Sequence, residues 1–481
     1  MNVKQGRLAF KIEPDRRPAS LTSYAGLPLF VETARALGLP QLIERCLGTW
    51  FQGTRYRAVD LAMAILAAIA AGAKSPADVA AMAQDKGLHA LLGVKHWPSE
   101  SAVLRFLYAF HELPDWRGGE KGRAVVPAES GPLRALYRIQ HGLLEALQER
   151  ERQRFATLDI DATIIESDKR DALPHYDGGT GYQPCITLWA EMGVIVRDHF
   201  RDGNVPAAMA PLAQIKRAVR ALPNAVERVF LRSDSALYSP KALVWMDRRG
   251  ITFGITADMT VALRAAITAL PASDWSRLRK PNPFGGVVPT DLEIAEVEFT
   301  PDSMCMSKRG RPFRFIVVRR IDDQAQLFTG SSPTHDEQGR RWHLALVTND
   351  WDGSAEAVWN WSRERCGSVE RTHDEIKNDL AAGVMPCGRF QSNAAWFRLN
   401  ALAYNVLTAM KLVGLPVPMR SWRPATLRFR LLNLAGRVVH HARGLLLKLP
   451  WILDLVDIYR DARRRLWTNA SRAAPAEVVA G

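Results

Sequence analysis

Two aspartates in a β-branched run are the first candidates for metal chemistry. Asp159 and Asp161 lie two residues apart in 155–164, FATLDIDATI, so in a strand they point to the same face. An acid in an otherwise apolar strand calls for a role, because burying an unpaired carboxylate is costly. Either residue can be the ligand. We favour Asp161 because it lies nearer the C-terminal end of the strand, and keep Asp159 as the reserve.

Two further acids occupy positions that would complete such a site. Asp234 ends the strand-like run 226–234, and Glu370 lies in the helical stretch 354–380. Taken alone, Asp234 also fits a turn, and Glu370 fits an exposed helical position. Oxygen ligands from converging carboxylates select hard divalent ions, and two such ions suit phosphodiester chemistry. We therefore predict that Asp161, Asp234 and Glu370 are catalytic and bind two Mg²⁺ or Mn²⁺ ions.

Basic residues surround Glu370 in the same stretch. Lys377 lies seven residues, about two helical turns, after Glu370 and therefore on the same face, where it can hold a phosphate. Arg363 and Arg365 add positive charge near that face. The alternative is a solvated helix with local ion pairs. We assign no role to His373.

The elements that must position these residues form one α/β unit. Periodicity predicts the order βββαβαβ, in the runs 155–164, 185–192, 193–200, 206–222, 226–234, 239–250 and 251–256. In the ribonuclease-H-like fold, which has this order, acids project from the first strand, the fourth strand and a later helix. Those are the elements that carry Asp161, Asp234 and Glu370.

The chain of 481 residues is longer than one hydrophobic core usually supports, so we predict a multidomain α/β protein. Its predicted parts are a helical N-terminal DNA-binding domain (1–150), the first part of a mixed-sheet catalytic domain (151–270), a β-rich insertion (271–350), the second part of the catalytic domain with the Glu370 helix (351–415) and a basic C-terminal region (416–481). DNA contact by the N-terminal helices rests on a possible helix-turn-helix without a sharp signature.

Composition narrows the partners. Lys and Arg outnumber Asp and Glu by 64 to 50, a net charge of +14 that favours a polyanion such as nucleic acid. The five cysteines have no metal-ligand spacing, which argues against a zinc site. The apolar stretch 58–73 contains Asp60 and is shorter than the ~20 residues that span a bilayer, so we expect a buried helix, no membrane partner and a cytoplasmic protein.

At these residues the sequence resembles the DDE transposases of bacterial insertion sequences, in the branch with the signature Tyr-x2-Arg-x3-Glu-x6-Lys. The resemblance spans nearly the whole chain and rests on LDIDAT (158–163), FRDGNV (200–205), LRSDSALYSP (231–240) and ERCGSVERTHDEIKNDL (364–380). It places the family's three acids on Asp161, Asp234 and Glu370, and its lysine on Lys377.

Two positions depart from that signature. Its tyrosine falls on Arg363 and its arginine on Cys366, while Arg365 lies one residue from the expected arginine. The resemblance also implies a β-rich insertion from which an aromatic residue stacks on a flipped DNA base, and Trp342 and Trp351 are the candidates. Core packing is the alternative for each tryptophan.

The function implied by the resemblance is cut-and-paste DNA transposition. We expect cleavage at the terminal inverted repeats of an element, strand transfer into double-stranded target DNA, and a homodimer in the synaptic complex. The arginines of the C-terminal region would contact phosphates, or form a solubilising face. The alternatives are a ribonuclease-H-like nuclease that does not join strands and a catalytically silent DNA-binding protein derived from a transposase.

Overall fold

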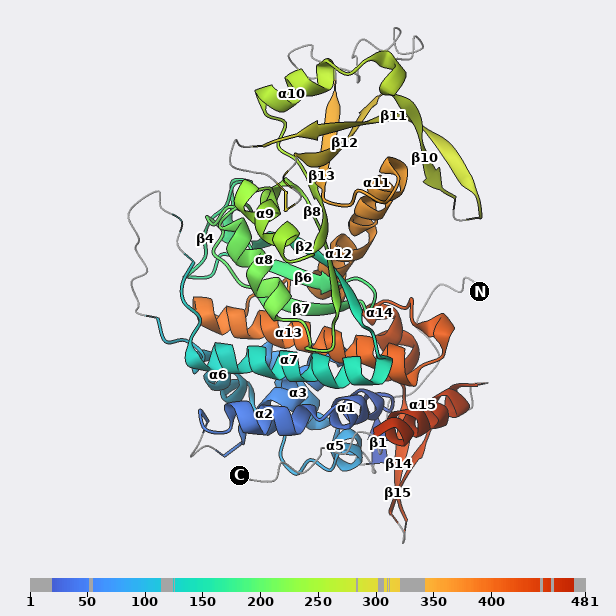
Figure 1. Cartoon of the computed structure of the whole chain (residues 1–481). Coiled ribbons are helices and arrows are strands. Elements are labelled where there is room, and N and C mark those ends of the chain that lie inside the picture. The colour runs from blue at the N-terminus through green and yellow to red at the C-terminus, as the bar shows by residue number, and fades with distance from the viewer. Residues whose placement is uncertain are drawn as a thin grey trace, which may run out of the picture.

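A nine-stranded mixed sheet runs through the centre of the molecule in the computed structural model (Figure 1). The strand order is β10-β11-β12-β13-β9-β8-β2-β6-β7. Its strands are β2 (Phe155–Ala162), β6 (Cys185–Trp189), β7 (Val194–His199), β8 (Arg228–Ser233), β9 (Thr252–Thr256), β10 (Ser276–Pro281), β11 (Val287–Phe299), β12 (Phe313–Arg320) and β13 (His343–Thr348). The structure describes residues 20–51, 55–113, 124, 126–282, 284–301, 307–308, 310, 312–320, 342–441, 444–450 and 454–470. Cys305 and much of the Gly- and Pro-rich stretch before residue 131 lie outside these residues.

The five strands of the predicted α/β unit have the register that the acids require. β2 pairs in parallel with β8, and Ile160 lies opposite Ser233, so the next residues, Asp161 and Asp234, emerge at the same edge. β9 continues the parallel set beyond β8, whereas β6 and β7 add antiparallel strands on the other side of β2. With α8 (Pro211–Arg220) and α9 (Pro240–Arg248), this confirms the predicted order βββαβαβ.

The N-terminal region is helical, as predicted. It contains α1 (Leu27–Ala36), α2 (Leu39–Leu47), α3 (Ala58–Ala71), α4 (Pro76–Ala81), α5 (Lys86–Leu92), α6 (Glu100–Tyr108) and α7 (Gly131–Glu151). Ser75 and Ser99 cap α4 and α6, because their hydroxyls accept backbone hydrogen bonds from the first turns. The alanine-rich α3 is buried almost throughout, so the apolar stretch is a core helix.

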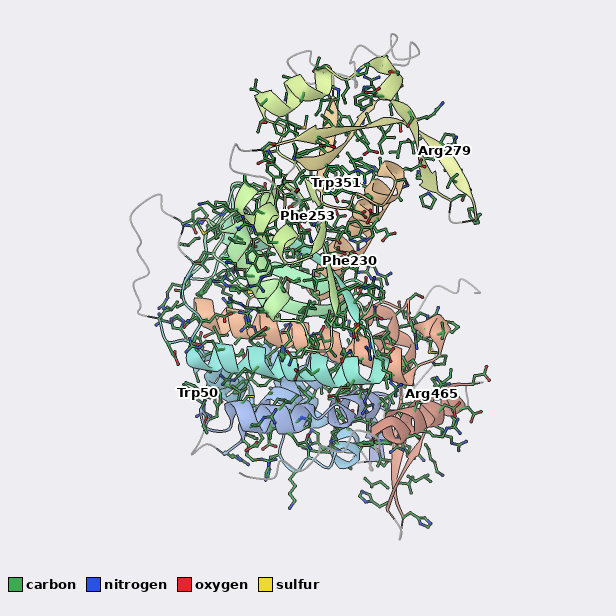
Figure 2. The ribbon with its side chains drawn as sticks, in the orientation of Figure 1. Trp50, Phe230, Phe253, Arg279, Trp351 and Arg465 are labelled. Atoms are coloured by element: carbon green, nitrogen blue, oxygen red, sulfur yellow. The ribbon has the colours of Figure 1, made fainter. Side chains whose placement is uncertain are left out.

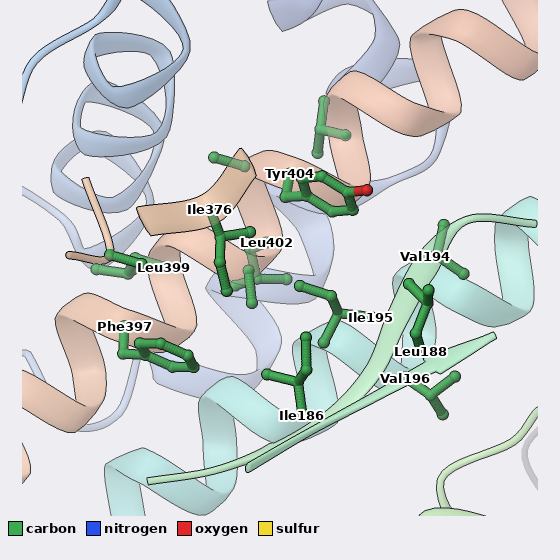
Figure 3. Close-up of a cluster of buried hydrophobic side chains, with 14 of the residues drawn as sticks. Ile186, Leu188, Val194, Ile195, Val196, Ile376, Phe397, Leu399, Leu402 and Tyr404 are labelled. Carbon is green, nitrogen blue, oxygen red and sulfur yellow. The ribbon is translucent and has the colours of Figure 1, made fainter. Parts of the chain in front are cut away.

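One long helix joins the N-terminal helices to the sheet. All twenty residues of α13 (Phe390–Ala409) are buried, and this helix packs against α3 and α7 as well as β7. Figure 3 shows Phe397, Leu399 and Leu402 of α13 in one buried cluster with the apolar side chains of β6 and β7. The helical region and the central sheet therefore share one continuous hydrophobic cluster. The predicted domain boundaries stay predictions.

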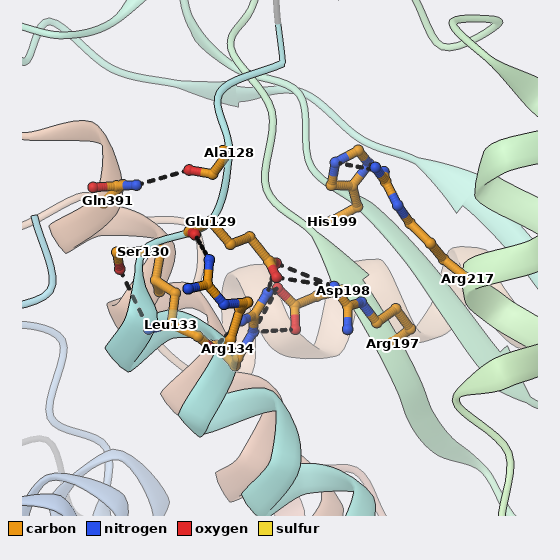
Figure 4. Close-up of polar contacts among 11 residues, drawn as sticks. Ala128, Glu129, Ser130, Leu133, Arg134, Arg197, Asp198, His199, Arg217 and Gln391 are labelled. Atoms are coloured by element: carbon orange, nitrogen blue, oxygen red, sulfur yellow. Dashed lines mark hydrogen bonds and ion pairs between the residues drawn. The ribbon is translucent and has the colours of Figure 1, made fainter. Parts of the chain in front are cut away.

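Buried ion pairs reinforce that junction (Figure 4). The guanidinium of Arg398, on α13, donates to both carboxylate oxygens of Asp198 on β7 and to Glu129 before α7. Arg197 also binds Glu129. Four charges from three segments are matched here, which fixes the sheet on the helices.

The predicted β-rich insertion extends the central sheet. β13 pairs antiparallel with β9, and β12, β11 and β10 follow outward. A second hydrophobic cluster lies here, between these strands and α11 (Ala355–Arg363). The helix α10 (Val261–Thr268) precedes β10.

The predicted helix over 354–380 is broken in the structure. α11 ends at Arg363, α12 (Arg365–Asp374) begins two residues later, and a π-helical turn, Glu375–Asp379, follows directly. A π turn changes the angular spacing of side chains, so the α-helical argument that placed Lys377 on the face of Glu370 does not hold. The position of Lys377 comes from its contacts, given below.

The C-terminal region, whose elements the sequence left undecided, forms both strands and helices. α14 (Pro424–Leu427) precedes β14 (Gly436–His441) and β15 (Gly444–Lys448). β14 pairs with β15 on one side and with β1 (Leu21–Thr22) on the other, and α15 (Leu455–Ala470) packs on α1. A small sheet of β3 (Ile165–Glu166), β5 (Thr180–Tyr182) and β4 (Leu173–Pro174) lies between β2 and β6 in the chain. Among the described residues no single helix is long and apolar enough to cross a membrane. The pair formed by α3 and the segment Pro76–Gln84 has sufficient length and apolar composition together, but it is bent by 98°.

Candidate active site

The three predicted acids come from the elements that the sequence assigned to them. Asp161 is the penultimate residue of β2, and Asp234 directly follows β8, where its carboxylate accepts a hydrogen bond from the backbone N–H of Ala236 at 3.0 Å. Glu370 lies in the middle of α12, is exposed, and belongs to a helix that packs against β2 and β6. The three side chains thus approach one edge of the sheet from three segments.

The electrostatics of Asp161 indicate that these acids act on one another. Its side chain is only 17% exposed. Burial raises the pKa of Asp161 to about 6; Arg365 opposes this shift, whereas the negative charges of Asp234 and Glu370 add to it. Asp161 therefore carries a carboxylate whose charge the surrounding protein does not fully balance.

This donor set fits a hard divalent cation. The acids offer only carboxylate oxygens, which suit Mg²⁺ or Mn²⁺, and a cation would stabilise the buried carboxylate of Asp161 and relieve the repulsion that Asp234 and Glu370 add. Among the described residues, no three His, Cys, Asp or Glu side chains already stand close enough to hold an ion. The fit to a divalent metal ion therefore rests on the chemistry of the carboxylate donors and not on a preformed metal site.

Asp159, the reserve ligand, has a different partner. It is fully buried, and Arg232 of β8 donates to its two oxygens at 2.7 and 2.9 Å. The hydroxyl of Ser368 on α12 also donates to it. Arg232 in turn binds Glu364 at 2.8 Å. Asp159 thus ties two strands to the helix of Glu370, which leaves Asp161 as the acid of β2 at the edge.

Of the three predicted basic residues, Arg365 lies beside Asp161, Lys377 binds just beyond the end of β2, and Arg363 lies apart. The ammonium of Lys377 donates to Ile164 O at 2.8 Å and to Thr163 Oγ1 at 3.2 Å, just beyond the end of β2, and burial lowers its pKa. Arg365 points its Nη1 at Asp161 Oδ2, 3.7 Å away. Arg363 is exposed at the end of α11.

His373, to which the sequence assigned no role, lies against the same carboxylate. Its Nε2 is 3.8 Å from Asp161 Oδ2, and its side chain is 7% exposed. Burial lowers the pKa of His373 to about 3, helped by the charges of Lys377 and Arg365, while the backbone of Asp161 acts in the opposite direction. The ring is therefore neutral. Its spacing of three residues from Glu370, one helical turn, was the signal in the sequence.

Comparison with known proteins gives this arrangement a family. The model described as "Transposase DDE domain group 1" matches residues 9–470. The chain belongs to this family. It is therefore a DDE transposase, an enzyme that acts on DNA, and members of such families use divalent metal ions.

Comparisons with curated proteins and with solved structures add little to the family match. No curated protein matches the sequence of this transposase. A cryo-EM structure of the piggyBac transposase synaptic complex with hairpin DNA is similar over 93% of this chain and 86% of that chain, with 11% identity and a TM-score of 0.43. The family match, and not this likeness, carries the assignment.

The predicted stacking residue of the transposase is partly buried. Trp342 packs against the second hydrophobic cluster, and the guanidinium of Arg320 lies 5.6 Å from its ring centroid. Because Leu346 of β13 lies opposite Thr256, the last residue of β9, Trp342 lies beyond that strand end, on the side of Asp161 and Asp234. Trp351, the other candidate, follows β13 near the base of α11 (Figure 2).

Several arginines of the basic C-terminal region bind the protein itself. Arg423 forms ion pairs with Asp374 and Asp379, directly beside α12. Arg463, on α15, donates from Nε and Nη2 to the two carboxylate oxygens of Glu32, each at 2.7 Å. These arginines brace the fold, whereas Arg465 extends from α15 into solvent (Figure 2).

Proposed function

We propose that this transposase cuts DNA at the ends of its element and joins the released 3′-hydroxyls to target DNA, with Asp161, Asp234 and Glu370 binding two Mg²⁺ or Mn²⁺ ions. The observation that supports the proposal best is the register of β2 with β8, which brings Asp161 and Asp234 out at one edge of the sheet, where α12 with Glu370 packs on β2. The charges of Asp234 and Glu370 both add to the raised pKa of Asp161. Three acids from separate segments that repel one another are the donor set of such a centre.

The chemistry of the bound ions is activation of an attacking water or 3′-hydroxyl and stabilisation of the leaving oxygen. The protein's own part is positioning. Asp161 and Asp234 are fixed by the parallel pairing of β2 with β8, and Glu370 is fixed by the buried contacts of Asp159 with Arg232 and Ser368. Lys377, anchored at the end of β2, presents an ammonium for a phosphate beside the acids.

We propose that the partners are the terminal inverted repeats and double-stranded target DNA, bound by a homodimer in the synaptic complex. The net charge of +14 supports a DNA partner.

The test uses the full chain, labelled transposon-end DNA and Mg²⁺ or Mn²⁺, beside the variant Glu370→Gln. We expect metal-dependent cleavage and joined products on denaturing gels, both lost in the variant. Glu375→Gln is unsuitable as the control, because Glu375 is buried and binds Arg371. Glu149→Gln, at an exposed position of α7, is the matched control and should retain both products.

Two other outcomes of this assay would each replace the proposed function with a different one. Cleavage without joined products would replace this proposal with a ribonuclease-H-like nuclease. DNA binding without cleavage in either metal would replace it with a silent DNA-binding protein, a reading that the departures at Arg363 and Cys366 support.

A further inference from the structure

The buried imidazole of His373 makes no hydrogen bond of ordinary geometry among the described residues, although the backbone of Asp161 acts on the ring. Buried polar groups in proteins are nearly always hydrogen-bonded, so such a ring beside a carboxylate requires an explanation. The Nε2 atom of His373 lies 3.8 Å from Asp161 Oδ2. A hydrogen bond over that distance is too long.

The separation suits two ligands of one metal ion. Donor atoms at about 2.0–2.2 Å from a six-coordinate ion lie roughly 3 Å apart when they are neighbours. The distance of 3.8 Å between Nε2 of His373 and Oδ2 of Asp161 is longer than that value, and a small side-chain movement closes the difference. Glu370 precedes His373 by three residues on α12, so the helix directs a carboxylate and an imidazole toward the same edge.

Arg365 lies at the same carboxylate oxygen as His373. Its Nη1 lies 3.7 Å from the same Asp161 oxygen and also has no hydrogen-bond partner among the described residues. Two nitrogen groups thus flank one carboxylate oxygen without binding it closely. The arginine supplies positive charge there, and the imidazole supplies a free lone pair.

We propose that His373 is a nitrogen ligand of the ion bound by Asp161, and that it makes the centre favour Mn²⁺ over Mg²⁺. Mg²⁺ takes oxygen ligands almost exclusively, whereas imidazole is an ordinary ligand of first-row transition metals. This rests on the proposed function, because it requires Asp161 to be a metal ligand. It adds a residue and a metal preference that carboxylates alone do not give.

The experiment is pulsed electron paramagnetic resonance of Mn²⁺ bound to the full chain without DNA. We expect modulation from a directly coordinated ¹⁴N nucleus, lost in His373→Gln and kept in His89→Gln. His89 is the matched control, because it is also buried but stacks on Trp97 among the N-terminal helices. Calorimetry should give Mn²⁺ an affinity at least about tenfold above that of Mg²⁺, a preference that His373→Gln reduces.

Isotope labelling keeps the test independent of variants that fold poorly. In the unaltered protein with ¹⁵N-labelled histidine, the ¹⁴N modulation should be replaced by ¹⁵N coupling. Bound Mn²⁺ without nitrogen coupling, abolished by Asp161→Asn, would overturn the role of His373 and leave the proposed function standing. Absence of any Mn²⁺ bound by the wild type would overturn both.

Discussion

Two clusters of charge in this molecule differ in how completely they are matched. At the junction of α13, β7 and α7, Arg398 makes hydrogen bonds to Asp198, Glu129 and the backbone of Leu133, with distances from 2.7 to 3.1 Å. At the edge of the sheet, Asp161 has a guanidinium at 3.7 Å and a neutral imidazole at 3.8 Å, with two other acids nearby.

The pKa values follow this difference. Burial alone would raise the pKa of Glu129, but Arg398 and Arg197 outweigh it and bring the pKa to about 2. Burial raises the pKa of Asp161 to about 6, and its single nearby arginine does not reverse the shift. A buried charge that has all its partners serves the fold, whereas one that lacks them is available for binding.

The largest expected effect comes from removing the unmatched carboxylate. Asp161→Asn should lower the rate of DNA cleavage by roughly a thousandfold or more, since a lost metal ligand removes several kcal/mol of transition-state stabilisation. Its melting temperature should not fall, because the carboxylate that it replaces lacks a full partner. Single-turnover cleavage and thermal unfolding measure the two quantities. A cleavage rate close to that of the wild type would exclude Asp161 from the centre.

Asp159→Asn, two residues away on the same face of β2, should behave in the opposite way. It leaves the buried guanidinium of Arg232 without its bidentate partner, which costs about 3 kcal/mol of unfolding free energy. Denaturant unfolding measures the loss. Unchanged stability with abolished Mn²⁺ binding would instead make Asp159 the metal ligand.

Asp159 and Asp161 also show which parts of the site can be predicted from the sequence and which cannot. The placement of Asp161, Asp234 and Glu370 on a first strand, a fourth strand and a late helix could be predicted, because hydrophobic periodicity and strand order are properties of local sequence. Asp159 has its role through Arg232, 73 positions later, and local sequence contains no such partnership. From the sequence alone, Asp159 and Asp161 are therefore equivalent candidates for the metal ligand of the strand.

Other features escaped the sequence for similar reasons. The π-helical turn Glu375–Asp379 follows α12 without a proline or glycine to mark it, so Lys377 was placed on the wrong grounds. The insertion strands could be recognised, but their continuation of the central sheet depends on the pairing of β13 with β9. His373 differs from a core histidine only in the absence of partners, which a sequence cannot contain.

Protonation of Glu129 should break the matched cluster. The pKa of Glu129 is about 2 in the folded protein and 4.5 in its ordinary state, so its stabilisation is complete above about pH 4.5 and is lost as the pH falls toward 2. Glu129→Gln should therefore lower the unfolding free energy at pH 7 by about 3 kcal/mol and flatten its dependence on pH between 4.5 and 2. Urea unfolding across that range measures both. An undiminished slope in the variant would mean that other acids account for the acid sensitivity.

The smallest effect comes from relieving the partial match at Asp161. Arg365→Gln removes a positive charge 3.7 Å from the carboxylate, so Mn²⁺ should bind about tenfold more tightly in the absence of DNA. Arg363→Gln removes the same charge from an exposed position two residues away and is the matched control, with an expected change of less than about twofold. Equal gains in both variants would reveal a general effect of net charge. A gain confined to Arg365→Gln would mean that this arginine competes with the metal ion for Asp161. The positive charge of Arg365 would then partly neutralise Asp161 until a metal ion takes its place.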